Sequence, residues 1–354
     1  MPDTSRSLHF IQFLFLAICI PVAVSADPGD YSYSIVHLSD TQTLSRDYPG
    51  TLNLTFASLE SIREANNISA IIITGDLVDS GTNETQWLHY SRARALTSIP
   101  LYEVSGNHDI GGSAQNYTTF DSWIGNGKRN WNADIEDFLF IGIGYRTAAL
   151  SSQEIDSYTT LIESEPEKKL IIATHDYFDG ITYTSPLSPL GTSLKTRMVM
   201  RDPTIIMAGH MHGIIQHTCD YNQNVLVEDM TDYQTWGNYS AGKIYTVNGT
   251  SGGIDRITVR DLFIVPSLSL GPEMTMYPKS SIIPVLDLPT RPADPDCDDL
   301  YEDIDGNGIS DFTDVRLFFS RMDWIAANEP VTAFDFNSNG RIEFDDIVRH
   351  YHGI

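Results

Sequence analysis

The chain has 354 residues, of which 41% are hydrophobic, so it is long enough to bury more than one core. Its formal net charge is −25, which excludes a nucleic acid duplex as an electrostatic partner. The charge is unevenly spread, because residues 294–354 contain 15 acidic and 4 basic residues, and such a local excess points to bound cations or to a solvated acidic segment.

The N-terminal residues predict export. After Arg6 a mostly apolar run extends from Leu8 to Val24, and Val24-Ser25-Ala26 is a small-residue cleavage pattern. We therefore expect a signal peptide at residues 1–26 and a secreted or cell-surface protein. The alternative is an uncleaved anchor, although the run is short for a full span. No later stretch reaches that length, so we expect no membrane span after cleavage.

An exported chain would meet an oxidising compartment. Removal of the signal peptide leaves Cys219 and Cys297, which could pair there. Six Asn-x-Ser/Thr sequons would permit glycosylation. The sequence decides neither modification.

The region from residue 27 to residue 279 alternates between apolar runs and looser helical patterns. This alternation is the spacing of an α/β domain, and continuous β-branched runs are typical of strands buried on both faces. The predicted strands cover 34–40, 70–74, 100–104, 137–143, 169–174 and 203–208, the predicted helices 53–66, 84–96 and 152–163, a long loop 111–135, and short antiparallel strands 213–268.

Side chains that can bind metals follow five of these strands. Taken singly, each is an ordinary turn, a helix cap or a structural histidine. Their coincidence favours one shared site, because strand ends of a parallel sheet meet at one edge. The five motifs are Asp40-x-Gln42, Gly75-Asp76, Gly106-Asn107-His108-Asp109, His175 and Gly209-His210-x-His212.

The ligand types indicate the chemistry. Mixed carboxylate, amide and imidazole ligands suit divalent transition metals such as Mn, Fe or Zn. Two such ions about 3.5–4 Å apart can share a bridging hydroxide and hold phosphoryl oxygens during in-line attack. The predicted activity is hydrolysis of a phosphomonoester, phosphodiester or phosphoanhydride, with a phosphorylated small molecule, lipid or nucleotide as the substrate.

In their order these motifs resemble the calcineurin-like metallophosphoesterase family over about residues 33–270. The resemblance implies a two-sheet α/β sandwich flanked by helices. It also implies that His108 contacts the phosphate or protonates the leaving oxygen and that Asp109 orients His108. One metal would be held by Asp40, Gln42, Asp76 and His212, and the other by Asp76, Asn107, His175 and His210, with Asp76 bridging the two.

One position departs from the family pattern. The first motif usually ends in His, whereas this chain has Gln42. An amide oxygen ligates a metal more weakly than an imidazole, so Gln42 bears on the occupancy of the first metal. The alternative hypothesis is therefore a surface binding protein on a phosphoesterase scaffold that has lost catalysis.

A Pro-rich segment at residues 280–297 predicts a linker, and a pattern beyond it repeats after about 32 residues. In each copy oxygen-bearing side chains stand at positions 1, 3, 5, 9 and 12 of a loop, Gly at position 6, and a helical pattern follows. This is the spacing of an EF-hand-type calcium loop, in which position 7 uses its carbonyl oxygen, and it predicts two bound Ca²⁺. The expected positions are Asp303, Asp305, Asn307, Ile309, Asp311 and Asp314, and then Asp335, Asn337, Asn339, Arg341, Glu343 and Asp346.

Two such loop–helix units resemble a type I dockerin domain over roughly residues 298–354. The resemblance implies a small α-helical domain that folds with calcium and docks to a cohesin-type protein partner. The Ser/Thr pairs common at loop positions 10 and 11 are replaced by Phe312-Thr313 and Phe344-Asp345, so the partner's identity stays open. A purely structural calcium clip is the other interpretation.

Overall fold

The computed structural model describes residues 30–110, 116–125, 129–179, 187–198, 204–210, 239–271, 273, 292–294, 300–307 and 309–353, together with the backbone of 216–220, 225–229 and 274–277. Several predictions lie outside these residues: the signal peptide at 1–26, the ligand His212, the Cys219 and Cys297 side chains, and most of the Pro-rich linker. Among the described residues, no helix has the length and apolar character needed to cross a membrane.

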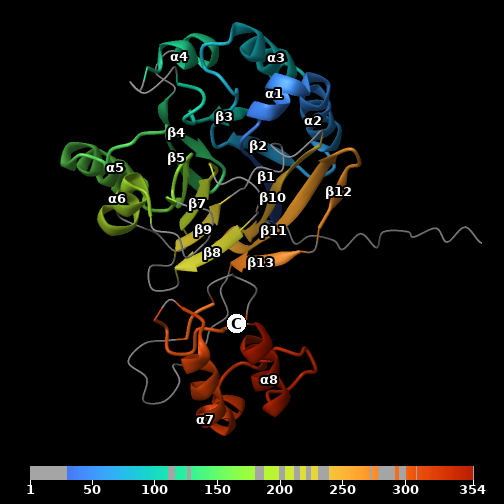
Figure 1. Ribbon diagram of the computed structural model, residues 1–354, viewed down its shortest axis with the longest axis vertical. Coiled ribbons are helices and arrows are strands. Elements are labelled where there is room, and N and C mark those ends of the chain that lie inside the picture. Colours follow the sequence, from blue (N-terminus) through green and yellow to red (C-terminus); the bar gives the residue numbers. More distant parts are fainter. Residues whose placement is uncertain are drawn as a thin grey trace, which may run out of the picture.

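Two sheets form the centre of the fold (Figure 1). In the first sheet, three neighbouring strands run parallel to one another. The strands on the other side of this group come from residues 240–277, late in the chain, and pair in antiparallel fashion. Its order is β12 (Ser269–Leu270), β11 (Gly253–Val265), β10 (Ser240–Thr250), β1 (Tyr31–Leu38), β2 (Ile68–Ile73) and β3 (Leu101–Glu103), with β13 (Met274–Tyr277) paired to β11.

The second sheet is parallel at its centre and antiparallel at both edges. Its order is β4 (Asn130–Ile135), β5 (Phe138–Ile143), β6 (Lys169–Thr174), β7 (Thr204–Ala208), β9 (Val225–Asp229) and β8 (Gln216–Asp220).

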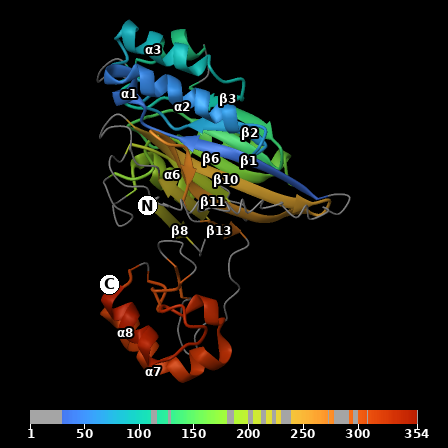
Figure 2. The same cartoon turned by 90° about the vertical axis from the view of Figure 1, so that its right-hand side faces the viewer.

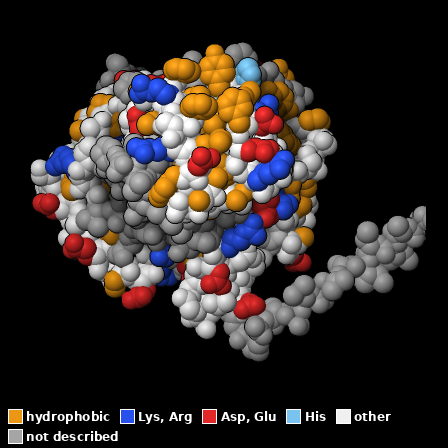
Figure 3. Space-filling model, turned by 90° about the horizontal axis from the view of Figure 1, so that it is seen from below, with side chains coloured by type: hydrophobic (Ala, Val, Ile, Leu, Met, Phe, Trp, Pro, Cys, Tyr) orange, Lys and Arg blue, Asp and Glu red, His pale blue; other side chains and the backbone are white. Residues whose placement is uncertain are grey.

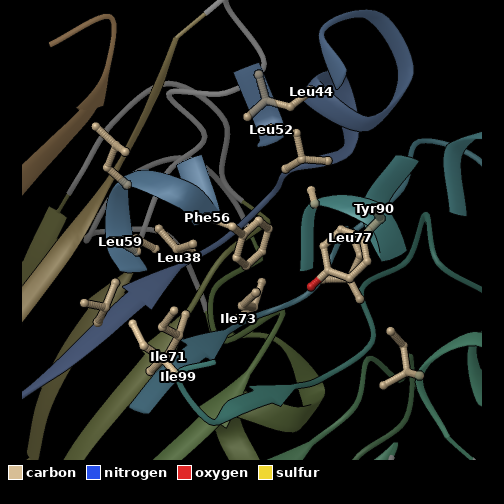
Figure 4. Packing of buried hydrophobic residues seen from close by; sticks show 14 of the residues in the cluster. Leu38, Leu44, Leu52, Phe56, Leu59, Ile71, Ile73, Leu77, Tyr90 and Ile99 are labelled. Atoms are coloured by element: carbon tan, nitrogen blue, oxygen red, sulfur yellow. The ribbon is translucent and has the colours of Figure 1, made fainter. Parts of the chain in front are cut away.

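Helices cover the outer face of each sheet. Figure 4 shows the packing on the first sheet, where Leu38, Ile71 and Ile73 lie against Phe56 and Leu59 of the covering helix. Burial of each such side chain stabilises the fold by about 1.5–3 kcal/mol. The first sheet carries α1 (Gln42–Asp47), α2 (Pro49–Ile62), α3 (Glu84–Arg94) and α4 (Thr118–Ile124), and the second carries α5 (Ser152–Ser164) and α6 (Pro189–Arg197).

A separate cluster of apolar side chains fills the space between the two sheets. Strands such as β2 and β5 are therefore buried on both faces, which is why their sequences are continuously apolar. The prediction of a two-sheet α/β sandwich flanked by helices is confirmed.

Two local predictions were wrong. Residues 111–135 were expected to form a loop, yet they contain α4 and the edge strand β4. In β4 the half-buried positions alternate with exposed ones, and Glu136, at φ +49°, closes a tight hairpin to β5. Within 213–268, where short strands were expected, residues 253–265 form the single long strand β11, because the polar pair Arg260-Asp261 continues the ladder to β10.

The C-terminal residues have a hydrophobic cluster of their own. The helices α7 (Phe312–Asn328) and α8 (Phe344–Gly353) and the short η3 (Val331–Ala333) enclose Ile304, Phe318, Phe334 and Ile347. Figures 1 and 2 show α7 and α8 apart from the sheets in both views. Ala293, inside the segment predicted as a linker, forms a β-bridge with Asp303, so part of that segment belongs with this C-terminal unit.

Candidate metal centre

Five strand ends meet at one edge of the two sheets. Within the first sheet, the Asp40 amide donates to the Gly75 carbonyl at 3.0 Å; within the second, the Gly209 amide donates to the His175 carbonyl at 2.9 Å. Between the sheets, the His210 amide donates to the Asp40 carboxylate at 3.2 Å. The structure therefore brings together motifs that lie up to 170 residues apart in the chain.

Three of the expected ligands have strained backbones. Asp40, Asp76 and His210 have φ of 55°, 51° and 76°, in the left-handed region that non-glycine residues rarely adopt. Such strain persists where the surrounding structure enforces it, and it is concentrated at functional sites.

Two glycines of the motifs are required by close packing. A Cβ atom on Gly106 would clash with the Asp76 carboxylate, and one on Gly209 would clash with Ser39 Oγ and approach Asp40 Oδ2 to 2.5 Å. The glycines therefore let the loops press directly against the two buried carboxylates.

His175 is fixed in the tautomer that a metal ligand needs. Its Nδ1 donates to the Thr74 carbonyl at 2.7 Å, which leaves Nε2 to face the other candidate ligands. That Nε2 lies 3.0 Å from Asn107 Oδ1 and 3.4 Å from Asp76 Oδ2.

The His210 ring completes this half of the site. Its Nδ1 lies 2.9 Å from Asn107 Oδ1 and 3.2 Å from His175 Nε2. Ligand atoms of Asp76, His175 and His210 all lie within 4.8 Å of one another. Two imidazole nitrogens and two oxygens facing one point are a donor set that fits a divalent transition metal, so this half matches the expected second metal.

Asp76 lies between the two halves. Its Oδ1 accepts the His108 amide at 2.9 Å, while Oδ2 faces both His175 and the Gln42 amide nitrogen, the latter at 3.3 Å. Gln42 and Asp40 are buried beside it, so the structure gathers three of the four residues expected at the first metal. The fourth, His212, lies outside the described residues.

The electrostatics of this pocket favour positive charge. Burial opposes protonation of His175, but the facing carboxylates of Asp76 and Asp40 outweigh burial and raise its pKa to about 10. Burial raises the pKa of Asp40 to about 7, whereas the charge of His175 overcomes burial at Asp76 and lowers the pKa of that carboxyl. A cation between these groups would meet the same attraction.

His108 lies at the accessible side of the site. Its Nδ1 donates to the Asp79 carbonyl at 2.8 Å, so Nε2 faces outward, 4.0 Å from Asp76 Oδ2. The imidazole is 37% exposed and, with Asp79 and Asn107, lines a shallow pocket of about 230 Å³. In the imidazolium form, an exposed Nε2 beside the candidate metal ligands can donate its proton to a departing oxygen.

The expectation that Asp109 orients His108 is wrong. Both carboxylate oxygens of this fully buried residue accept backbone amides, Oδ1 from Val78 at 3.0 Å and Oδ2 from Gly106 at 2.7 Å. Asp109 therefore ties the loop after β2 to the loop after β3. Burial, together with the charge of Asp76, raises its pKa well above the usual value.

Asp79 orients His108 instead, and the sequence analysis missed it. Besides the carbonyl contact, its Oδ1 lies 3.9 Å from His108 Nδ1, and Arg46 holds the same oxygen at 2.9 Å. The signal was present in the sequence, since Asp79 follows Gly75-Asp76 by three residues on the same loop.

Tyr145 is a second residue that the sequence analysis missed. It follows β5 at the same edge, and its ring centre lies 6.0 Å from that of His175 and 6.3 Å from that of His210. The ring forms a wall beside the imidazole half of the metal centre.

Among the described residues of 111–135 and 177–200, the aromatic side chains mostly pack into the core. Trp123 stacks on Trp87 on the outer face of the first sheet, and Tyr177 and Phe178 are buried against the second. Trp131 packs between the sheets, Tyr117 donates to the Tyr145 carbonyl near the site, and Tyr183 lies outside the described residues.

Comparison with known sequences gives a family and two relatives. The model of the calcineurin-like phosphoesterase family matches residues 33–214. The uncharacterized protein YvnB of Bacillus subtilis (strain 168) is 22% identical over 214 residues, which is 54% of this chain and 16% of YvnB. A probable glycerophosphodiester phosphodiesterase, GpdQ of Arcobacter nitrofigilis, is 26% identical over 154 residues, 40% of this chain and 56% of that protein. The chain thus matches little more than half of one relative and a sixth of the other.

Among solved structures, the purple acid phosphatase PPD1 from yellow lupin seeds aligns with a TM-score of 0.52 and 14% identity over 69% of this chain and 53% of that one. A likeness at this identity shows a shared fold.

Proposed function

The chain belongs to the calcineurin-like phosphoesterase family, and from that premise we propose that it is a metal-dependent hydrolase of phosphoester bonds with a dinuclear centre. The observation that carries the proposal is the convergence of Asp76, Asn107, His175 and His210 on one point. A phosphorylated small molecule, lipid or nucleotide is the proposed substrate.

The residues divide into two ligand sets and a proton donor. Asp76, Asn107, His175 and His210 would hold one ion, and Asp40, Gln42, Asp76 and His212 the other. When bound, the ions supply positive charge and an activated water for hydrolysis. His108, held by Asp79, lies where its imidazolium form can protonate the leaving oxygen.

A direct test compares three variants of the metal-loaded protein. His108→Ala should lower turnover of a chromogenic phosphoester by about 10²-fold or more while leaving the melting temperature unchanged, because the imidazole is partly exposed. Asp76→Asn should also reduce the number of bound metal ions. His352→Ala, in the exposed C-terminal turn, is the matched control. Full activity in both site variants would refute the proposal.

The second candidate function is a binding protein that has lost catalysis, favoured by Gln42 in place of His. Metal analysis of the purified protein separates the two. Two equivalents of transition metal support the enzyme, whereas none supports the binder.

The C-terminal unit is proposed to bind two Ca²⁺. Carboxylates of Asp303, Asp305 and Asp314 lie within 4.8 Å of one another in the first loop. The second loop repeats its hydrogen bonds 32 residues later: the Asp305 amide donates to Asp314 and the Asn337 amide to Asp346, at 3.0 and 3.1 Å. Two loops built alike, each rich in inward oxygens, support a pair of calcium sites.

The same unit exposes an aromatic face. Phe312, Phe319, Phe344 and Tyr351 are 63%, 61%, 53% and 51% exposed. Phe312 contacts Tyr351 and Phe319 contacts Phe344, each at 6.1 Å between ring centres, so the pairs join α7 to α8. Figure 3 shows hydrophobic side chains gathered on this unit in the view from below. Exposed apolar faces of this kind mark protein interfaces, and we propose a cohesin-type protein as the partner.

Docking is tested with the full chain on a panel of immobilised cohesin modules. Binding should require Ca²⁺, and Phe312→Ser with Phe344→Ser should weaken it at least about tenfold. Leu88→Ser, at an exposed position on α3, is the control for loss of an apolar side chain elsewhere. Absence of binding to every module would leave the structural calcium clip as the better interpretation.

Export completes the proposal. Cleavage after Ala26 would give a mature protein beginning at Asp27. N-terminal sequencing of the protein from culture medium should find that residue; an intact N-terminus on membranes would instead support the anchor.

A further inference from the structure

The stretches of sequence that contain the predicted ligand motifs are poor in basic side chains. Residues 74–91, 104–127, 174–194 and 209–242 contain no Lys or Arg. Between residues 39 and 62, Arg46 is the one basic residue. Enzymes that bind a terminal phosphate group commonly place Arg or Lys on its outer oxygens, because that group carries close to two negative charges at neutral pH.

Arg46 is already engaged by two carboxylates. Its Nη1 lies 2.9 Å from Asp79 Oδ1, and its Nη2 lies 2.7 Å from Asp47 Oδ2. Recruiting it to a substrate phosphate would release Asp79, which orients His108.

Two arginines beside β4 and β5 are also paired. Arg146 bonds Glu154 at 2.6 Å. Arg129 lies over the Tyr117 ring at 4.7 Å and 3.3 Å from Asp121. Lys128 lies outside the described residues.

The pocket beside His108 is lined by neutral groups and one acid. Ser80 and Thr82 offer hydroxyls, Asn107 an amide and Ile110 an apolar surface, while the acid, Asp79, is paired with Arg46. Such a lining can accept an uncharged alcohol or sugar substituent, but it offers no Lys or Arg of its own to a second phosphate charge.

We infer that the site selects phosphodiesters over phosphomonoesters. A diester carries one negative charge and two organic substituents, so one substituent can leave beside His108 while the other remains attached to the phosphate. The metal centre would be the same for both esters, so what this chain's own residues add is the lack of a second positive charge for the second negative charge of the monoester. This inference rests on the proposed function and names its substrate class.

The test uses two esters with the same leaving group, p-nitrophenyl phosphate and methyl p-nitrophenyl phosphate. At pH 8 the metal-loaded protein should show a kcat/KM at least about tenfold higher for the diester, since one missing charged contact is worth about that factor. At pH 5, where the monoester has taken up a proton, the ratio of the diester's kcat/KM to that of the monoester should be smaller.

A gain-of-function variant supplies the absent charge. Thr82→Arg, at an exposed position on the pocket rim, should raise the kcat/KM of the monoester relative to the diester by about tenfold. Thr82→Gln, with similar reach and no charge, should keep the original ratio.

The outcomes separate the two proposals. Turnover of the monoester equal to or above that of the diester overturns the substrate inference and leaves the hydrolase standing. Turnover of neither ester, with two metals bound, overturns the proposed function and this inference together. An unchanged ratio in Thr82→Arg would show that charge at this pocket does not set the preference.

Discussion

Gln42 is the residue on which the proposed metal chemistry most depends. It is buried at the start of α1, with its amide 3.3 Å from the Asp76 oxygen that faces both halves of the site. An amide at this point keeps the geometry of a ligand while lowering its affinity, since its oxygen is a weaker donor than imidazole nitrogen to Mn, Fe or Zn.

Gln42→His should therefore strengthen binding of the first metal by at least about tenfold, a size typical of changes at metal sites. Competition titration against a chromophoric chelator measures this without any substrate. Gln42→Ala should weaken the same site and leave the second metal in place. Equal affinity in wild type and Gln42→His would show that residue 42 is not a ligand.

Asp109 has the opposite character, structural rather than chemical. Its two oxygens satisfy the buried amides of Val78 and Gly106, so Asp109→Asn would turn an amide NH₂ toward one of those donors. We expect a loss of about 1–3 kcal/mol in the free energy of unfolding, the cost of a buried unsatisfied group. Urea denaturation measures it, with His108→Ala as the comparison, because that change leaves both amide contacts intact.

At the scale of elements, β1 carries a buried histidine that links two strands. His37 Nε2 lies 2.9 Å from Thr74 Oγ1, just after β2, and His37 lies opposite Lys243 of the neighbouring strand β10. Burial, and then the charge of Lys243, lower the pKa of His37 from 6.5 to about 3. The folded state therefore holds this imidazole neutral.

The unfolded chain binds this proton more readily than the folded one. The contribution of His37 to the free energy of unfolding is therefore fully present above pH 6.5 and is lost as the pH drops from there toward 3. The loss is at most about 1.4 kcal/mol per pH unit. His37→Gln should flatten this part of the stability curve between pH 6.5 and pH 4.5, measured by denaturant titration at each pH. A curve parallel to that of the wild type would contradict the assignment.

At the scale of the whole molecule, the C-terminal unit has its own apolar cluster, distinct from the three clusters of the sheets. Separate clusters unfold separately when little connects them. The unit also carries the acidic loops, whose carboxylates repel one another unless a cation lies between them.

Calorimetry of the full chain should accordingly show two transitions, of which only one responds to Ca²⁺. At a hundred times the dissociation constant, each bound ion should stabilise the unit by about 2.7 kcal/mol. Asp314→Ala with Asp346→Ala should abolish the response and leave the other transition in place. A single transition that moves as a whole with Ca²⁺ would contradict independent unfolding.

The sequence by itself determined the class of fold, the five strand ends and the repeat of the acidic loops. It could do so because buried parallel strands are continuously apolar, and because candidate ligands such as Asp76 and His175 follow them within three residues. Spacing within one loop is local, so Asp303 to Asp314 and the copy 32 residues later were also readable.

Only the tertiary structure decided which groups face one another. The orientation of His108 was expected from Asp109 but comes from Asp79, because both residues lie on neighbouring loops and only their directions separate them. Tyr145 and the pairing of Arg46 likewise depend on contacts between segments far apart in sequence. Side-chain direction and long-range pairing arise when the sheets pack together, and no pattern within a single stretch of chain records them.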